Sequence, residues 1–107
     1  MGALQQSKTM LVTTEFVLLE VADALSASQL RSRTVAYIEW LRRWSQVHII
    51  LADHQLLLDG WRLYSQRPDK DWGLTDCTSF VIMTHEHIGS AFTSDRHFQQ
   101  AGFVKLL

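Results

Sequence analysis

Apolar residues recur along the chain with two different spacings, and the two spacings alternate. Short apolar runs, rich in β-branched or aromatic residues, predict strands at Met10–Thr13, Val47–Leu51, Ala91–Thr93 and Phe103–Leu106. Apolar positions three or four residues apart predict helices over about 15–27, 32–45, 54–64, 76–87 and 96–101. Thr14, Asp53 and Thr75 precede three of these helices and are expected to cap them, and Gly89 is expected to end the fourth helix.

Alternating strands and helices, with no internal repeat and no low-complexity linker, are typical of an α/β domain. Such a domain has a mostly parallel sheet with helices on both faces. We therefore predict a single domain over 1–107. In an α/β sheet, ligands gather at the carboxyl ends of the strands, so residues just after the strands are the candidates for function.

Helical spacing also predicts which side chains face the core. The first helix has an apolar side made of Phe16, Leu19, Val21, Ala22 and Leu25. The second is expected to bury Val35, Ile38, Leu41 and Trp44. The tryptophans at 40, 44 and 61 are expected to be mostly core residues, whereas Trp72, in a charged loop around Pro68, is expected to be partly exposed.

Composition narrows the class of protein. The 107 residues are 47% hydrophobic and carry a formal net charge of −1, which argues against a disordered tail and against a uniformly basic nucleic-acid binder. Cys77 is the only cysteine, so the chain has no disulfide framework and no cysteine zinc cluster. No apolar run approaches the length of a membrane span and no signal pattern opens the chain, so a cytoplasmic protein is expected.

Three carboxylates are the strongest candidates for chemistry. Asp76 falls in the first turn of a predicted helix, Asp95 follows a predicted strand, and Glu20 lies in a helix among apolar neighbours. Carboxylates with no cysteine or obvious histidine partner suit a hard ion such as Mg²⁺ or Mn²⁺, which can activate water and neutralise a phosphate. The same residues also have an explanation without a metal. Asp76 can interact with the helix dipole, Asp95 can cap a helix, and Glu20 can be a solvated helix residue.

Two segments, WGLTDCTSFVIM (72–83) and AFTSDRHFQQAGF (91–103), resemble the C-terminal half of a PIN domain. The likeness is to the VapC-type ribonuclease toxins of bacterial toxin–antitoxin pairs. LVTTEFVLLEVADAL (11–25) and the order of elements follow the same family, so the resemblance extends from Met10 to Leu107. It implies a PIN-like three-layer α/β/α sandwich.

The resemblance implies a metal-dependent endoribonuclease in which Glu20, Asp76 and Asp95 hold Mg²⁺ or Mn²⁺. It also implies an RNA substrate, a cognate antitoxin and a homodimer. Substrate contacts are expected from residues beside the carboxylates, namely Thr75, Ser79 and His97. From the residues alone, Thr75 is explained equally well as a helix cap as by a contact with substrate. His97 can contact substrate or can simply pack beside Phe98. The arginine pairs at 31 and 33 and at 42 and 43 can hold RNA phosphates or serve only solubility.

PIN domains open with an apolar strand that ends in an aspartate, and no segment before Met10 matches that unit. The expected fold is therefore N-terminally truncated and lacks one acidic ligand. We expect little or no ribonuclease activity from this chain alone, and apolar surface that favours self-association. The alternative function is a catalytically silent PIN remnant that acts as a dimerising or antitoxin-binding module.

Overall fold

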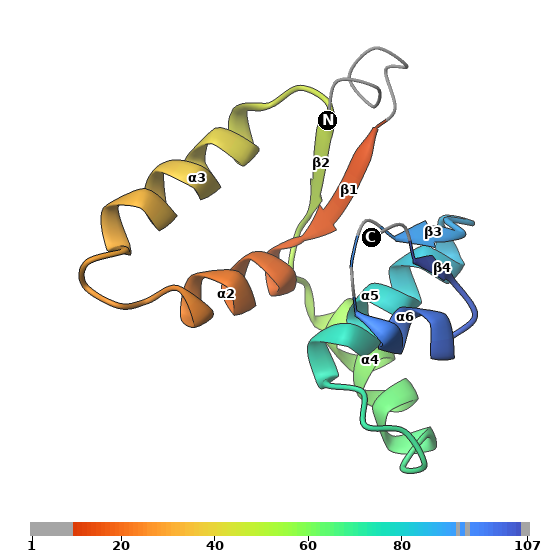
Figure 1. The fold of residues 1–107 in the computed structure, drawn as a ribbon. Coiled ribbons are helices and arrows are strands. Elements are labelled where there is room, and N and C mark those ends of the chain that lie inside the picture. Colours follow the sequence, from red (N-terminus) through yellow and green to blue (C-terminus); the bar gives the residue numbers. More distant parts are fainter. Residues whose placement is uncertain (1–9, 92, 94, 106–107) are drawn as a thin grey trace. The chain divides into compact units, whose positions relative to one another are not determined.

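The computed structural model describes residues 10–91, 93 and 95–105 (Figure 1). The chain divides into two compact units, Met1–Ala52 and Asp53–Leu107. Each unit combines helices with one pair of parallel strands among its described residues. The prediction of parallel strands alternating with helices is therefore confirmed. The predicted strand residues Phe92 and Leu106 lie outside the part of the chain that the structure describes.

The described residues of the N-terminal unit, 10–52, form two strands and two helices. In chain order they are β1 (Leu11–Thr14), α2 (Glu15–Ala24), α3 (Arg31–Arg43) and β2 (Val47–Ile50). β1 and β2 run parallel, in a register that places Leu11 beside Val47 and Thr14 beside Ile50. A parallel pair needs a long crossover connection, and the two helices supply it.

α2 begins where Thr14 ends β1. The Thr14 side chain accepts a hydrogen bond from the Val17 N–H at 3.2 Å, as predicted for the cap. Leu18 lies four residues after Thr14 on the same face and is buried. Leu19 is 60% exposed, so the prediction that Leu19 faces the core is wrong. Apolar residues occur on nearly every side of this helix, and periodicity could not choose between adjacent leucines. The helix also ends at Ala24, three residues before the predicted end.

α3 buries Thr34 where Val35 was expected. Thr34 is 6% exposed and Val35 is 46% exposed. The Thr34 hydroxyl donates to the carbonyl oxygens of Leu25 at 3.1 Å and Leu30 at 3.0 Å, which ties the start of α3 to the end of α2. Because these two carbonyls satisfy the hydroxyl, the polar side chain can occupy a buried position.

The C-terminal unit contains three helices and two short strands. They are α4 (His54–Gln66), α5 (Leu74–His85), β3 (Ser90–Ala91), α6 (Arg96–Gln100) and β4 (Val104–Lys105). The Asp53 carboxylate accepts a hydrogen bond from the Leu56 N–H at 2.7 Å, so the predicted cap of α4 is confirmed. β3 and β4 pair in parallel, with Ser90 beside Val104.

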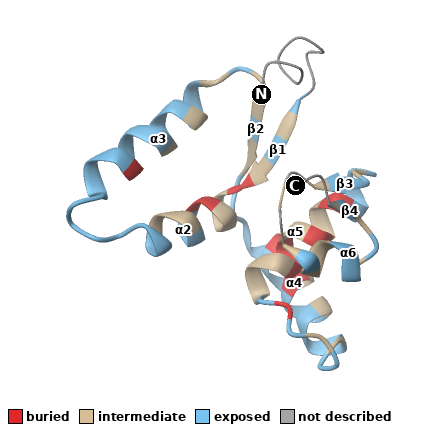
Figure 2. Ribbon diagram, in the orientation of Figure 1, coloured by how far each residue is buried: buried red, intermediate tan, exposed pale blue. Residues whose placement is uncertain are grey.

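The core of this unit gathers around Phe80 of α5, where Figure 2 shows most of the buried positions. The Phe80 ring meets Trp72 and Phe98 edge-on, with centroids 5.0 and 4.9 Å apart, and lies 5.7 Å from Phe103. Trp72 is only 6% exposed, so its predicted exposure is wrong. Its indole N–H donates to Gln100 at 3.2 Å, which satisfies its polar group inside the core. Burial also raises the pKa of the Cys77 thiol, which favours its unreactive protonated form.

The left-handed residue that follows α5 is His87 and not the predicted Gly89, because the helix itself ends at His85. His87 has φ 56°, in the left-handed region. Its N–H donates to the Thr84 carbonyl at 3.3 Å, and the Ile88 N–H donates to the Met83 carbonyl at 2.7 Å. This pair of bonds is the Schellman arrangement, in which glycine is usual at the left-handed position. A histidine therefore occupies a backbone conformation that suits glycine better.

His87→Gly is expected to raise the free energy of unfolding by about 0.5–1 kcal/mol. The gain is the left-handed strain of a non-glycine residue, roughly 1–2 kcal/mol, less the extra freedom of glycine in the unfolded chain. Thermal unfolding followed by circular dichroism measures it. Gly89→Ala, where an added Cβ meets nothing within 4 Å, is the control and should change stability little. A destabilised His87→Gly protein would contradict the assignment of His87 to the helix end.

Candidate functional site

Asp76 is held at the N-terminus of α5. The helix is capped at Gly73, so Asp76 is its third residue and Thr75 lies inside the helix; the predicted cap at Thr75 is wrong. The Asp76 Oδ2 atom accepts a hydrogen bond from the Gly73 N–H at 3.1 Å. This reach back to the chain ahead of the helix is one half of a capping box, and it fixes the carboxylate while the helix dipole favours its charge.

Asp95 and His97 are placed by the start of α6. The Asp95 Oδ1 atom accepts a hydrogen bond from the His97 N–H at 2.9 Å and so caps the helix. The Asp95 N–H donates to the Thr93 hydroxyl at 3.1 Å. The bond from the His97 N–H orients the Asp95 side chain.

The packing of α6 on α5 brings the three side chains together. Phe98 follows His97 directly and meets Phe80, one turn after Asp76, at 4.9 Å between ring centroids. The His97 Nδ1 atom lies 3.1 Å from Asp95 Oδ1 and 3.7 Å from Asp76 Oδ2. One ligand atom from each of the three residues lies within 4.8 Å of the others.

The electrostatics of this cluster favour a cation. His97 Nδ1 is buried, and among the described residues it has no hydrogen-bond partner. It faces two carboxylates, so three atoms with lone pairs converge there when Nδ1 is unprotonated. A divalent ion satisfies such a set, and two carboxylates with one imidazole are ligands that Mn²⁺ accepts and that Mg²⁺ accepts in part. The residues present therefore fit a divalent metal.

The other predicted site residues are distributed over both units. Glu20 is an exposed residue of α2, in the N-terminal unit, and its place among the ligands stays a prediction. Thr75 and Ser79 are half-buried in α5, near Asp76 in the chain, and their contact with substrate also stays a prediction. His97 was predicted only as a substrate contact or a packing residue. Its spacing from Asp95 was visible in the sequence, but its closeness to Asp76 depends on the fold.

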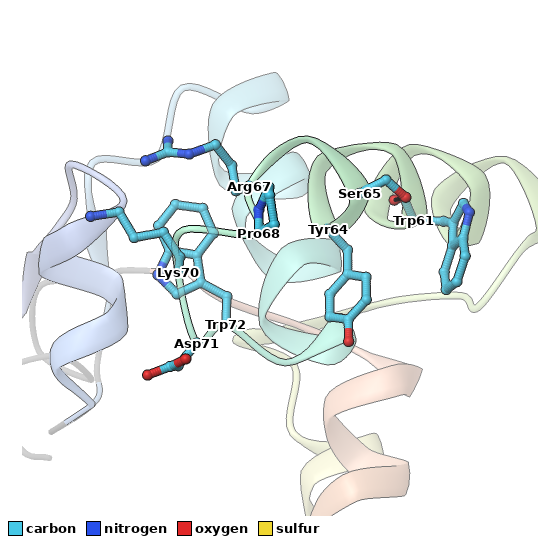
Figure 3. Close-up of a pocket in the computed structure, with 8 residues that line it drawn as sticks. All are labelled: Trp61, Tyr64, Ser65, Arg67, Pro68, Lys70, Asp71 and Trp72. Carbon is cyan, nitrogen blue, oxygen red and sulfur yellow. Dashed lines mark hydrogen bonds between the residues drawn. The ribbon is translucent and has the colours of Figure 1, made fainter.

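A shallow hollow of about 500 Å³ lies elsewhere in the C-terminal unit, lined by residues from Trp61 to Trp72. Figure 3 shows the Arg67 and Lys70 side chains beside the Trp72 ring, with Trp61 at the other end. Arg67 lies 5.2 Å from that ring and makes two hydrogen bonds of 2.9 Å to Asp69. These bonds lower the pKa of Asp69 to about 2. Arg67 is therefore neutralised, whereas Lys70 forms no ion pair with any described residue. None of the residues that line the hollow belongs to the cluster of Asp76, Asp95 and His97.

Comparison with solved structures finds the same fold in a bacterial toxin. The chain is similar to VapC20 of Mycobacterium tuberculosis, a toxin that cleaves the sarcin–ricin loop, with a TM-score of 0.83 and 25% sequence identity. The match covers 98% of this chain and 81% of VapC20. No protein-family model matches the sequence. No curated protein matches it either.

The predicted resemblance to VapC-type PIN domains is thus confirmed at the level of the fold. The chain has a VapC-type PIN fold, with mixed helices and parallel strands. None of the helices in the described residues is long and apolar enough to cross a membrane. The fold alone does not define an activity, so function is argued from the site.

Proposed function

We propose that this chain is a metal-dependent endoribonuclease of a toxin–antitoxin pair. The observation that carries the proposal is the convergence of Asp76, Asp95 and His97 within 4.8 Å. The convergence occurs in a fold shared with VapC20, a toxin that cleaves the sarcin–ricin loop. The proposed partners are an RNA substrate, a cognate antitoxin and a second copy of the chain, in the cytoplasm.

In this function, Asp76 and Asp95 hold Mg²⁺ or Mn²⁺ through carboxylate oxygens, and His97 offers Nδ1 to the same ion. The predicted ligand set also includes Glu20. When bound, such an ion polarises a phosphoryl oxygen and lowers the pKa of water, the two requirements for hydrolysis of a phosphodiester. Thr75 and Ser79 contribute hydroxyl groups that can donate hydrogen bonds to the phosphate.

The caps make this site rigid. Asp76 accepts from the Gly73 N–H and Asp95 accepts from the His97 N–H, so both carboxylates keep their orientation without a ligand. The oxygens that accept these bonds, Asp76 Oδ2 and Asp95 Oδ1, are also the ones beside His97 Nδ1, and each keeps a lone pair for the ion. Positioning of this kind matters because a displacement of about 1 Å at a reacting group can cost on the order of a hundredfold in rate.

The test is to incubate the purified chain with a labelled single-stranded RNA in Mn²⁺, in Mg²⁺ and in EDTA. We expect slow cleavage with the metals, in line with the little activity expected of this chain alone, and none with EDTA. The site requires a divalent ion, so restoring Mn²⁺ after EDTA should restore cleavage. Binding of RNA or of a second copy without cleavage under any of these conditions would instead support the alternative, a catalytically silent PIN module.

A further inference from the structure

A row of aromatic rings runs along α3. Tyr37 stacks on Trp40 with centroids 6.1 Å apart, and Trp40 stacks on Trp44 at 5.0 Å, each at an interplanar angle below 30° (26° and 27°). Tyr37 is 51% exposed and Trp40 is 47% exposed, against the prediction that the tryptophan is a core residue. Two stacked and exposed rings leave a continuous aromatic surface that is open to a ligand.

The same helix is strongly basic. Its 13 residues contain Arg31, Arg33, Arg42 and Arg43 against the single acid Glu39, in a chain whose net charge is −1. All four arginines are exposed, and none forms an ion pair with any residue that the structure describes. Arg31 and Arg33 lie in the first turn, where the helix dipole favours anions. The partial positive charge of the helix N-terminus repels these arginines, and a bound anion would reduce this repulsion.

Of the four arginines, only Arg33 shares a face of α3 with the ring stack. At 3.6 residues per turn, Arg33, Tyr37, Trp40 and Trp44 fall within an arc of about 60° around the helix. Arg33 therefore lies one turn before the Tyr37 end of the stack. Among the described residues only Trp40 stacks on Tyr37, so the stack is open at that end. Arg42 lies on the opposite side of the helix.

From this arrangement we infer that α3 binds RNA through an unpaired base inserted between the Arg33 guanidinium and the Tyr37 ring. The base continues the stack of rings, and the charge of Arg33 attracts the neighbouring phosphate. The inference rests on the proposed function, because it names RNA with unpaired bases as the ligand.

The aromatic hollow of the C-terminal unit serves as an internal comparison. Tyr64 is 43% exposed and stacks on Trp61 at 5.7 Å, much as Tyr37 stacks on Trp40. The arginines near that pair are neutralised, since Arg62 pairs with Asp59 at 3.3 Å and Arg67 with Asp69. Exposed aromatic rings occur in both units, but only on α3 do unpaired arginines accompany them among the described residues.

The experiment measures binding of the full chain to a fluorescein-labelled single-stranded RNA by anisotropy, in EDTA so that no cleavage occurs. Tyr37→Leu removes the ring and keeps an apolar side chain with good helix propensity. We expect it to weaken binding about 5- to 150-fold, the range for one stacked base. Tyr64→Leu is the matched control and should change binding less than twofold. Circular dichroism checks that both variants fold.

Two arginine variants test the same face of α3 and leave its aromatic rings unchanged. Arg33→Gln should lower affinity and reduce the slope of log affinity against log salt by about 0.7, the value for one phosphate contact in a single strand. Arg42→Gln removes the same charge from the opposite side of α3 and should change affinity less. A fully paired RNA should lose little on Tyr37→Leu, because its bases cannot insert.

Equal losses in Tyr37→Leu and Tyr64→Leu, or in Arg33→Gln and Arg42→Gln, would overturn the inference. So would a Tyr37→Leu chain that binds RNA normally but no longer self-associates in sedimentation, since the face would then join two copies. Failure here is separate from failure of the proposed function. If the chain cleaves RNA with metal and Tyr37→Leu binds RNA normally, only the inference about α3 is contradicted. If binding depends on the Tyr37 ring but no metal supports cleavage, only the proposed nuclease activity is contradicted.

Discussion

Asp95→Asn is expected to remove the stabilisation that Mn²⁺ gives to the folded chain. A ligand that binds only the folded state adds about 2.7 kcal/mol at a hundred times its Kd, which is on the order of 10 °C for a domain of this size. Asparagine keeps a side-chain oxygen to accept from the His97 N–H, and it is as good a cap as aspartate. The variant should therefore fold normally, lose the shift with Mn²⁺, and lose any Mn²⁺-supported cleavage by about a hundredfold or more.

Differential scanning fluorimetry over a series of Mn²⁺ concentrations measures the shift. Asp71→Asn is the matched control, because Asp71 is an exposed carboxylate five residues before Asp76 that lines the aromatic hollow instead. Its shift with Mn²⁺ should equal that of the wild type. An equal Mn²⁺ shift in Asp95→Asn and the wild type would show that the ion binds elsewhere and would refute the site.

Gly60→Ala is expected to destabilise the C-terminal unit by about 1–2 kcal/mol. A Cβ at this buried glycine would lie 2.6 Å from Thr78 Cγ2 and 3.2 Å from the Thr78 nitrogen. Overpacking of this kind costs about 1–3 kcal/mol, and the better helix propensity of alanine returns only about 1 kcal/mol. The close approach of α4 to α5 depends on this position, and α5 carries Asp76. Urea unfolding followed by circular dichroism gives the change in free energy.

Thr78→Ser separates the clash from other effects of the substitution. Serine lacks Cγ2 but keeps the hydroxyl, which donates to the Thr75 carbonyl at 2.6 Å. Gly60→Ala combined with Thr78→Ser should be more stable than the sum of the single changes, because the second change removes the atom that the first one meets. Strict additivity would show that the helices adjust without a clash.

The capping residues show how much of the fold can be read locally. Thr14, Asp53 and Asp95 each accept a hydrogen bond from an N–H two or three residues later. Such bonds depend only on residue type and on the residues that follow, so the sequence predicted the starts of α2, α4 and α6. Parallel pairing of β1 and β2 was also predictable, because helices fill the connection between them.

The choice among similar residues was not predictable in the same way. Trp72 is buried and Trp40 and Trp61 are exposed, the reverse of their predicted positions. Helical spacing shows that residues share a face, but it does not show whether another element covers that face. The end of α5 is a second case, since His87 adopts a conformation that the sequence would assign to Gly89.

The sequence by itself determined the candidate carboxylates, because Asp76 and Asp95 occupy the starts of helices where acidic side chains are locally favoured. It also determined the order of parallel strands and helices that the comparison with VapC20 matches. Only the tertiary structure decided that His97 Nδ1 lies 3.7 Å from Asp76 and 3.1 Å from Asp95. The physical reason is that Phe80 and Phe98 pack α6 against α5, and contacts between residues so far apart in the chain follow from burial of apolar surface, not from local propensity.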